Sequence, residues 1–221
     1  MRTQGYDVSN DLGIDRSNNL YLIGTTSGGL ENSDQLGKDV FLAKFDSNGN
    51  ALWRKQFGTD REDEGIALAL DGSSNIYTAS QAGTNIRVAK FTSSGQQIWT
   101  IEHGSNEIDT PAGIATLNDG TSFLTGQTNG VLEGGGKSIL ESDSFMAKYN
   151  SSGNLVATTQ YGSSYSRNGS RVLTQDIGSA ITVGKNADVF LTGATQGSLS
   201  PQDFPNKQIG TWDIYVERRT I

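Results

Sequence analysis

The sequence predicts an all-β protein that is built from four copies of one repeat. Short runs that mix aliphatic and aromatic residues recur four times along the chain. The 221 residues include 28 glycines and only 3 prolines, and clusters of Asn, Asp and Ser separate the runs, which is typical of many tight turns between short strands. Lys44, Lys90 and Lys148 occupy equivalent positions 46 and 58 residues apart, near the roughly 40–50 residues of a repeat that forms one small sheet.

Charge and composition restrict the partners that we expect. A formal net charge of −7 and a pI near 4.7 do not provide the concentrated basic surface that a nucleic acid requires. The chain has no cysteine, which excludes disulfides and thiolate chemistry. The first residues lack the apolar core of a signal peptide, and no apolar run approaches the roughly 20 residues that span a bilayer. We therefore expect a soluble chain without membrane insertion, and any signal or anchor is expected outside these 221 residues.

The first repeat shows the pattern of strands and turns most clearly. Apolar runs punctuated by turn residues predict strands at residues 8–14, 20–25, 40–45 and 51–57. Turns are expected at residues 15–19 and 46–50, where Asn and Gly tolerate a positive φ. Each turn is short, so we expect antiparallel hairpins.

The other repeats follow the same order with loops of different length. The second predicts strands at 65–70, 76–79, 86–91 and 97–103, the third at 112–117, 122–125, 144–149 and 155–161, and the fourth at 179–183, 189–192 and 214–218. The fourth repeat therefore ends without a fourth strand.

The third strand of each repeat is apolar on both sides, as in residues 40–43 and 145–147, which indicates burial on both faces. Small antiparallel sheets that pack face to face around an axis satisfy this requirement, so we predict a β-propeller with four-stranded blades and a last blade that lacks its outer strand. A β-sandwich is the alternative, but it does not predict repetition. The expected organisation is one propeller over residues 1–221, with repeats at about 7–58, 63–104, 111–162 and 178–221, or a fragment of a larger propeller.

Long loops are expected on one side of the predicted disc. The connections between second and third strands are long at residues 26–38, 127–143 and 194–211 and short at 81–85, and an insertion at 163–177 precedes the fourth repeat. In an up-and-down blade these connections share a face with the connections between blades. Insertions gathered on one face commonly mark a binding surface.

Three segments resemble the bacterial β-propeller repeats known as SBBP repeats: residues 71–77 (DGSSNIY), 39–53 and 56–59. The resemblance implies a secreted or cell-surface bacterial protein, binding of a protein or a glycan, and no established catalytic motif. Ala157 departs from it, because Trp53 and Trp99 occupy that position in the first two repeats. The absent last strand leaves an open edge that could mediate self-association, or that residues 1–5 could close by pairing with Tyr215 and Val216.

Several residues suggest chemistry until the repeats are aligned. The single histidine, His103, aligns with Phe57 and Tyr161, so we expect it to pack rather than to act as a base. The Gly-Thr motifs at 24–28, 126–130 and 193–197 resemble a nucleophile elbow, but their recurrence indicates strand ends. A glycine-rich stretch at 134–138 lacks the spacing of a phosphate-binding loop. The turn at 46–50 begins like a calcium loop, but a plain turn is favoured.

The acidic residues at the loop face are the remaining candidates for binding a cation or a basic partner. Alternatively, each caps local hydrogen bonds as Asx turns do. They comprise Asp39, Asp143 and Asp213 at the start of third strands, and Asp63, Glu64 and Asp109 between repeats. No catalytic residue and no cofactor are predicted; calcium stays an alternative. Trp53 and Trp99 are expected to seal neighbouring blades, with exposed sugar-stacking platforms as the other interpretation.

The sequence thus favours a non-catalytic binding or interaction module over two alternatives. The first alternative is a propeller-type lyase or hydrolase with an acidic or metal-dependent site on the loop face, which would need several converging acids with a base or a metal. The second is a structural spacer in a longer repeat protein.

Overall fold

The computed structural model describes residues 5–30, 37–135, 142–167, 170–197 and 212–219. All regular elements in these ranges are β-strands. The described residues contain no helix that is long and apolar enough to cross a bilayer. Blade 1 consists of β1 (Asp7–Ile14), β2 (Leu20–Thr26), β3 (Asp39–Phe45) and β4 (Ala51–Phe57). Blade 2 consists of β5 (Asp63–Leu70), β6 (Ile76–Ala82), β7 (Asn85–Phe91) and β8 (Gln97–His103).

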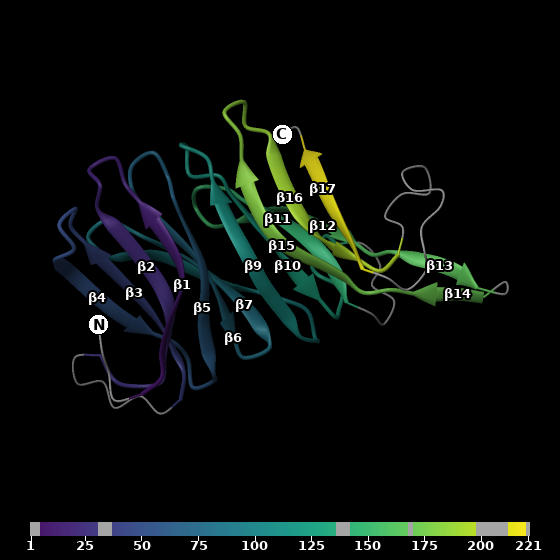
Figure 1. Ribbon diagram of the computed structural model, residues 1–221, viewed down its shortest axis with the longest axis horizontal. Helices are drawn as coiled ribbons and strands as arrows, with labels where there is room; N and C mark the ends of the chain where they lie inside the picture. Colours follow the sequence, from purple (N-terminus) through teal and green to yellow (C-terminus); the bar gives the residue numbers. More distant parts are fainter. Residues whose placement is uncertain (1–4, 31–36, 136–141, 168–169, 198–211, 220–221) are drawn as a thin grey trace.

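Blade 3 consists of β9 (Asp109–Thr116), β10 (Ser122–Thr128), β11 (Asp143–Tyr149) and β12 (Leu155–Tyr161). A separate hairpin follows, formed by β13 (Ser164–Arg167) and β14 (Ser170–Leu173), and it projects away from the blades (Figure 1). Blade 4 has three strands, β15 (Asp176–Val183), β16 (Val189–Thr195) and β17 (Asp213–Arg219). Within each blade, every strand pairs with the strand that follows it in the sequence, and all of these pairings are antiparallel.

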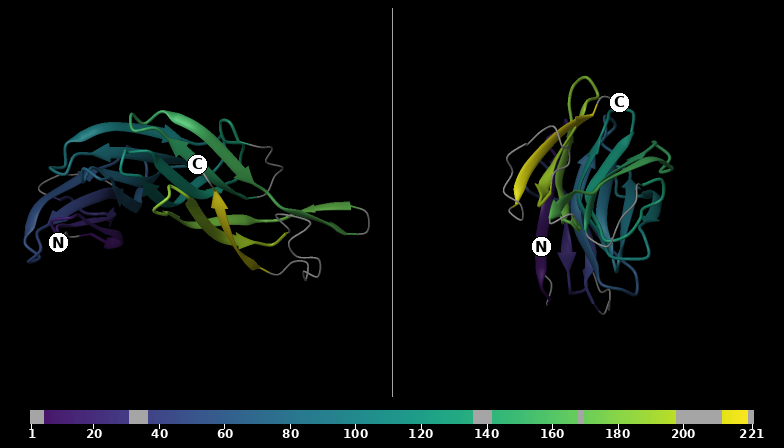
Figure 2. Two further views of the ribbon diagram at one scale, coloured as in Figure 1. Left: turned by 90° about the horizontal axis from the view of Figure 1, so that it is seen from above. Right: turned by 90° about the vertical axis from the view of Figure 1, so that its right-hand side faces the viewer.

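The blades stand side by side in an arc, with the first strands β1, β5, β9 and β15 as neighbours (Figure 1). Seen from above, the arc is a crescent whose first and last blades lie at its two ends (Figure 2). This arrangement confirms the predicted all-β propeller fold with four repeats. No pairing among the described strands joins blade 4 to blade 1, so the described part of the propeller is open.

The tight turns form because an Asp or Asn side chain replaces backbone partners at the strand end. The Asp15 carboxylate accepts hydrogen bonds from the backbone N–H groups of Ser17 and Asn19, at 2.8 and 2.9 Å. Asp46 does the same for Asn48 and Asn50. These bonds end one strand and aim the next strand back along the sheet.

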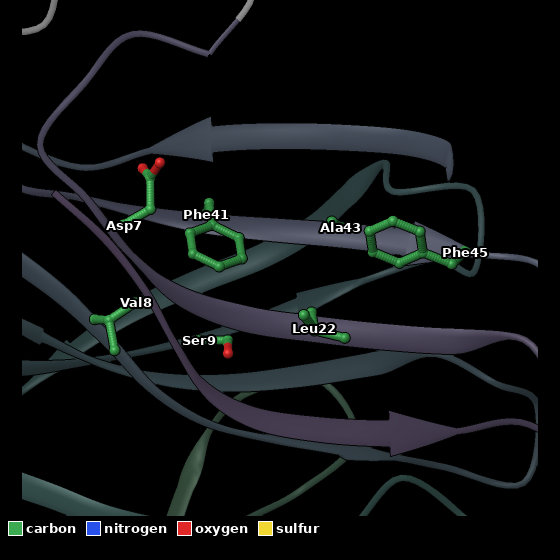
Figure 3. A pocket seen from close by; sticks show the side chains of 7 residues that line it. All are labelled: Asp7, Val8, Ser9, Leu22, Phe41, Ala43 and Phe45. Carbon is green, nitrogen blue, oxygen red and sulfur yellow. The ribbon is translucent and has the colours of Figure 1, made fainter. Parts of the chain in front are cut away.

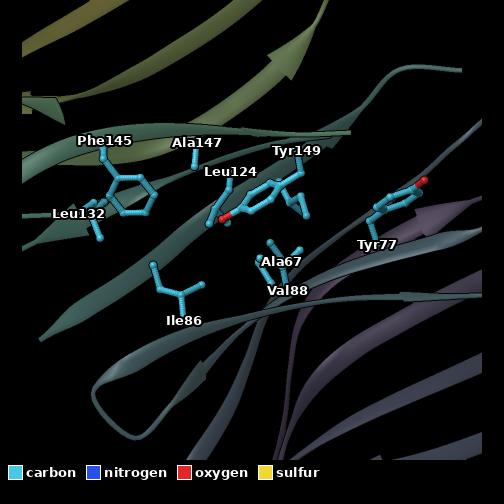
Figure 4. Close-up of a cluster of buried hydrophobic side chains, with 11 residues drawn as sticks. Ala67, Tyr77, Ile86, Val88, Leu124, Leu132, Phe145, Ala147 and Tyr149 are labelled. Carbon is cyan, nitrogen blue, oxygen red and sulfur yellow. The ribbon is translucent and has the colours of Figure 1, made fainter. Parts of the chain in front are cut away.

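Packing between blades forms the core. One cluster lies between blades 1 and 2 and includes Tyr21, Ile23 and Leu42 from blade 1 with Leu68 and Phe91 from blade 2. The second cluster lies between blades 2 and 3 (Figure 4). Its labelled members are Ala67, Tyr77, Ile86, Val88, Leu124, Leu132, Phe145, Ala147 and Tyr149. Blade 2 contributes to both clusters: its third strand β7 places Ile86 and Val88 in the second cluster and Ala89 and Phe91 in the first. This strand is therefore buried on both faces, as the sequence predicted.

The first strand of each blade begins earlier than the sequence suggested. We expected starts at residues 8, 65, 112 and 179, whereas the strands begin at Asp7, Asp63, Asp109 and Asp176. A β-bulge lies near the start of each of these pairings. In blades 2, 3 and 4, hydrophobic periodicity missed these residues because a buried acid, Asp63, Asp109 or Asp176, interrupts the apolar pattern.

The outer edge of β17 has no strand partner among the described residues. The predicted closure by residues 1–5 falls mostly on residues 1–4, which lie outside the described residues. Just after them, the Tyr6 carbonyl accepts a hydrogen bond from the Ser27 N–H at 2.8 Å, and the Tyr6 N–H donates to the Ser27 hydroxyl. The chain at Tyr6 is therefore attached to blade 1, at the opposite end of the arc from β17 (Figure 1).

Candidate functional site

A row of buried aspartates opens the first strands and holds the loops between blades. The fully buried Asp109 carboxylate accepts hydrogen bonds from the Ser105 N–H at 2.5 Å, from the Ser105 hydroxyl and from the Thr128 hydroxyl. The Asp63 carboxylate accepts hydrogen bonds from the backbone N–H and the hydroxyl of Thr59, both at 2.7 Å. The carboxylates thus satisfy backbone and side-chain donors that the turn between two blades would otherwise bury without partners.

Asp39 and Asp143, which open third strands, form a second repeated clamp. Each is buried and accepts a hydrogen bond from an outer-strand amide, Gln56 Nε2 at 2.7 Å and Gln160 Nε2 at 2.8 Å. The oxygen of the Gln56 side chain accepts from the Leu30 N–H at 2.7 Å. The clamp therefore ties the long connection between second and third strands to the outer strand.

Glu64 and Asp213 differ from the other four candidate acids because they reach the surface. Glu64 forms an ion pair with Lys38, with 2.6 Å between Nζ and Oε1, and both side chains are partly exposed. Asp213 is exposed at the start of β17. The six candidates thus divide into four that serve internal hydrogen bonds and two that face solvent, and their binding role stays a prediction.

The described residues contain no group of three or more His, Asp or Glu side chains placed to hold a metal ion. The turn at residues 46–50 was the alternative calcium site. Both carboxylate oxygens of Asp46 there accept hydrogen bonds from within the turn, including one from Asn50 Nδ2 at 2.9 Å. Asp46 accordingly has a pKa below its ordinary value, chiefly because of the bonds from Asn50. This geometry is that of a self-contained Asx turn.

A charged cluster lies at the junction of blades 1 and 2. The Arg87 guanidinium lies 3.0 Å from Glu102 and 3.6 Å from Oδ1 of the buried Asp63, and Arg61 also bonds to Glu102 at 3.0 Å. Burial acts to raise the pKa of Glu102, but the hydrogen bonds from Arg87 and Arg61 outweigh it and bring the pKa below its ordinary value. The acids and bases neutralise one another, which is typical of a structural network.

His103 packs between blades, as its alignment predicted. Its ring is 6.0 Å from that of Tyr149, edge to face, and 6.3 Å from that of Phe145. Burial lowers the pKa of His103, so the neutral form is favoured. Phe57 makes the equivalent contact with Phe91 at 5.2 Å, and Tyr161 makes it with the Arg219 guanidinium at 5.4 Å.

The two outer-strand tryptophans link each blade to the next, which supports the sealing role over sugar platforms. Trp53 Nε1 donates to the Ser93 carbonyl and Trp99 Nε1 to the Ser151 carbonyl, both at 3.2 Å. Each indole also lies against the glycine of the same turn: a β-carbon on Gly153 would be 2.8 Å from Trp99. We call this contact the tryptophan latch. Ala157 leaves blade 3 without one.

The Gly-Thr motifs are strand ends, as expected. A β-carbon on Gly24 would lie 2.7 Å from the Phe41 ring, and one on Gly193 would lie 2.6 Å from the Tyr215 ring. At both positions the β-carbon would come still closer to a backbone carbonyl oxygen of the first strand, that of Val8 or Ile177, so the close approach of that strand requires glycine and the aromatic ring adds to the restriction. The glycine-rich stretch at 134–138 falls largely outside the described residues, at residues 136–138.

The sequence reasoning missed the two exposed faces at the ends of the arc. On blade 1, Leu12 and Ile14 are 58% and 59% exposed, whereas Leu68, the counterpart of Leu12 in blade 2, is 6% exposed. The same face carries an open pocket of about 210 Å³ (Figure 3). It is lined by Asp7, Val8, Ser9, Leu22, Phe41, Ala43 and Phe45. We call this surface the entry face.

Blade 4 exposes the face with which an earlier blade packs against the blade that follows it. Ile214 and Val216 are 80% and 74% exposed, whereas their blade 1 counterparts Val40 and Leu42 are fully buried against blade 2. Trp212, just before β17, is 45% exposed. We call this surface the exit face. Exposed large aliphatic side chains grouped on one face are typical of an interaction site.

The chain is similar in structure to several proteins of known structure. No protein-family model and no curated protein matches the chain. A candidate gluconolactonase has a TM-score of 0.45 and 14% identity over 96% of this chain and 59% of its own. A gluconolactonase from Xanthomonas campestris has the same TM-score and identity over 84% and 54%. Drosophila Plexin A in complex with Semaphorin 1b has a TM-score of 0.34 and 9% identity over 98% and 55%.

The chain therefore spans somewhat more than half the length of these structures. Two of them are named as gluconolactonases, which contradicts the prediction that the chain is not an enzyme, and we do not keep that prediction. A likeness at this TM-score and identity does not carry their activity over to this chain.

Proposed function

We propose that the protein is an interaction module that binds protein partners, further copies of itself among them, through its entry and exit faces. The observation that carries the proposal is the exposure of Leu12, Ile14, Ile214 and Val216, at positions that other blades use as core. A fully buried aliphatic side chain of this size contributes about 1.5–3 kcal/mol. Covering these faces would therefore provide a driving force of several such contributions.

Flat, blade-shaped partners fit these faces best. Within the chain, the equivalent positions Leu68, Val40 and Leu42 lie in the cluster between two neighbouring β-sheets. A partner that reproduces a neighbouring blade would bury the pocket beside Phe41 and Phe45 together with the exposed side chains around it. The interaction would be apolar at its centre, with polar turns at its edges, as in typical protein interfaces.

Light scattering on wild-type protein and on Ile214→Asp tests this proposal. We expect the wild type to associate as its concentration rises, and the aspartate to prevent association, because a charge in a desolvated interface is costly. Leu52→Asp is the matched control, since Leu52 is 53% exposed on the outer strand β4 and its counterpart Ile98 is 50% exposed although blade 2 has a neighbouring blade on each side. Circular dichroism would establish that both variants fold. Wild-type protein that stays monomeric, or an equal effect of the two variants, would refute the proposal.

The SBBP resemblance supports a narrower version of the proposal. Under it, the protein belongs to that repeat family, works outside or on the surface of a bacterial cell, and uses the loop face for a further protein or glycan. Glu64 and Asp213 are the candidate acids that reach the surface there. Loss of binding on a glycan and protein array after removal of residues 29–37 would support this use of the loops, and unchanged binding would count against it.

The lyase or hydrolase alternative agrees with the names of the two gluconolactonase structures. A lyase or hydrolase site on the loop face would need several converging acids together with a base or a metal. In the described residues, Asp63 and Asp109 are instead engaged by Thr59, Ser105 and Thr128. A lactone-hydrolysis assay, with and without divalent cations, separates this alternative from the interaction module.

A further inference from the structure

We infer that the junction between blades 2 and 3 is a hydration site, which binds ordered water between four buried polar groups. These groups are the imidazole of His103 and the hydroxyl groups of Thr116, Ser122 and Tyr149. The inference goes beyond the proposed function and does not depend on the entry and exit faces, because all four residues lie between two blades inside the chain.

The equivalent junction between blades 1 and 2 is apolar at the same four positions. These positions are the last residue of the outer strand of one blade and, in the next blade, the last residue of the first strand, the first of the second strand and the last of the third strand. Between blades 1 and 2 they hold Phe57, Leu70, Ile76 and Phe91, which all belong to the apolar cluster there or pack against it. Between blades 2 and 3 they hold His103, Thr116, Ser122 and Tyr149. Four changes from an apolar to a polar side chain therefore coincide at one junction.

Strand pairing places the three hydroxyl-bearing residues side by side. Ser122 is the register partner of Thr116 in β9 and of Tyr149 in β11. Directly paired residues carry their side chains on the same face of a sheet, with β-carbons roughly 4.5–5.5 Å apart. This face is turned toward blade 2, because Tyr149 belongs to the cluster between blades 2 and 3 (Figure 4). His103 of blade 2 lies against it, with its ring 6.0 Å from that of Tyr149.

The four polar groups are buried and neutral. His103 Nε2 and the three hydroxyl oxygens have no hydrogen-bond partner among the described residues, and Ser122 and Tyr149 are fully buried as whole residues. Burial lowers the pKa of His103 and raises that of Tyr149, which keeps the imidazole and the phenol uncharged. Buried polar groups in native proteins are almost always hydrogen-bonded, either to the protein or to ordered water. Four such groups at one junction therefore point to water as their common partner.

Water matches these groups in size and in chemistry. Thr116 and Ser122 fill less volume than Leu70 and Ile76, which occupy the same positions in the apolar junction. A buried water typically makes about three hydrogen bonds, and hydroxyl groups can both donate to it and accept from it. An apolar ligand would leave the same groups unpaired. A metal ion would lack charged ligands, because none of the four groups is a carboxylate.

A crystal structure of the wild-type protein, at a resolution that shows ordered water, tests the site directly. We expect a water oxygen at about 2.7–3.2 Å from at least two of the four polar atoms. The double variant Thr116→Leu, Ser122→Ile copies the apolar junction and is expected to exclude this water. A well-ordered wild-type junction without water, or one in which the four groups bond directly to each other, would overturn the inference.

Tyr149→Phe gives a second test in solution, because the sign of its effect differs between a hydrated and a dry junction. Phenylalanine fits the position, since Phe91 occupies it in blade 2. With water bound, the variant loses a hydrogen bond, so the equilibrium constant for folding should fall roughly 2- to 12-fold. In a dry junction the variant removes an unpaired hydroxyl, so the constant should rise. Tyr21→Phe, which removes a hydroxyl that donates to Asp15 at 3.1 Å, is the control for loss of a bonded hydroxyl. An unchanged or larger constant for Tyr149→Phe would contradict the hydration site.

Discussion

At the residue scale, equivalent positions in the repeats keep a role while they change chemistry. Phe57, His103 and Tyr161 each end an outer strand and place a ring on the last residue of the next blade's third strand. The ring is what the position requires, and the buried Nε2 of His103 has no hydrogen-bond partner among the described residues. A histidine there adds a pH dependence that phenylalanine would not.

His103→Phe is therefore expected to remove part of the acid sensitivity of the fold. Burial lowers the pKa of His103 in the folded state, so the unfolded state binds the proton first as the pH falls through about 6.5. The contribution of His103 to stability is complete above that pH and declines below it, by at most about 1.4 kcal/mol per pH unit. Urea unfolding between about pH 7.5 and 5.5 measures it. Equal slopes for wild type and variant would contradict this role.

At the element scale, the strands and turns were largely predictable, whereas the polar clamps were not. The turns at Asp15 and Asp46 followed from their Asn and Gly spacing, and the tryptophan latch followed from the recurrence of Trp53 and Trp99. For Asp109 the sequence left two interpretations, a binding acid at the loop face or a cap of local hydrogen bonds, and it did not predict that the carboxylate is fully buried. Its burial depends on Ser105 and Thr128, which lie on different strands and loops and become neighbours only in the folded blade.

Replacement of two turn glycines by alanine measures how much the tryptophan latch contributes to the free energy of unfolding. Gly49 and Gly153 have φ values of 83° and 86°, so alanine imposes similar backbone strain of about 1–2 kcal/mol at both. A β-carbon at Gly49 meets nothing within 4 Å, whereas one at Gly153 would lie 2.8 Å from Trp99. Gly153→Ala should therefore destabilise the protein more than Gly49→Ala and should shift the Trp99 fluorescence. Equal losses of unfolding free energy would mean that the latch contributes nothing.

The aspartate clamp makes a second prediction at this scale. Asp109→Ala removes a fully buried carboxylate and leaves the Ser105 N–H and two hydroxyl groups without their acceptor, so we expect a loss of about 2–4 kcal/mol in unfolding free energy. Asp213→Ala, at an exposed position, should change it by less than about 0.5 kcal/mol. Thermal and urea unfolding compare the two. A small effect of Asp109→Ala would favour its predicted role as a binding acid.

At the scale of the whole molecule, the repeat predicted the propeller but not its open ends. Leu12, Ile14, Ile214 and Val216 follow the same periodicity as core residues, and a sequence pattern does not reveal whether a neighbouring blade is present to cover them. Only the arrangement of the blades shows that these side chains are exposed (Figures 1 and 2). The exposed faces then become the main candidate for function, in place of the loop face that the sequence favoured.

Small-angle X-ray scattering of the wild-type chain, recorded across a concentration series, tests the central claim most directly. If the entry and exit faces are binding surfaces, the mass and the radius of gyration measured at high concentration should exceed those of one chain. The Ile214→Asp variant should retain the profile of a single crescent at every concentration. A wild-type profile that remains that of the single crescent throughout the series would contradict the account.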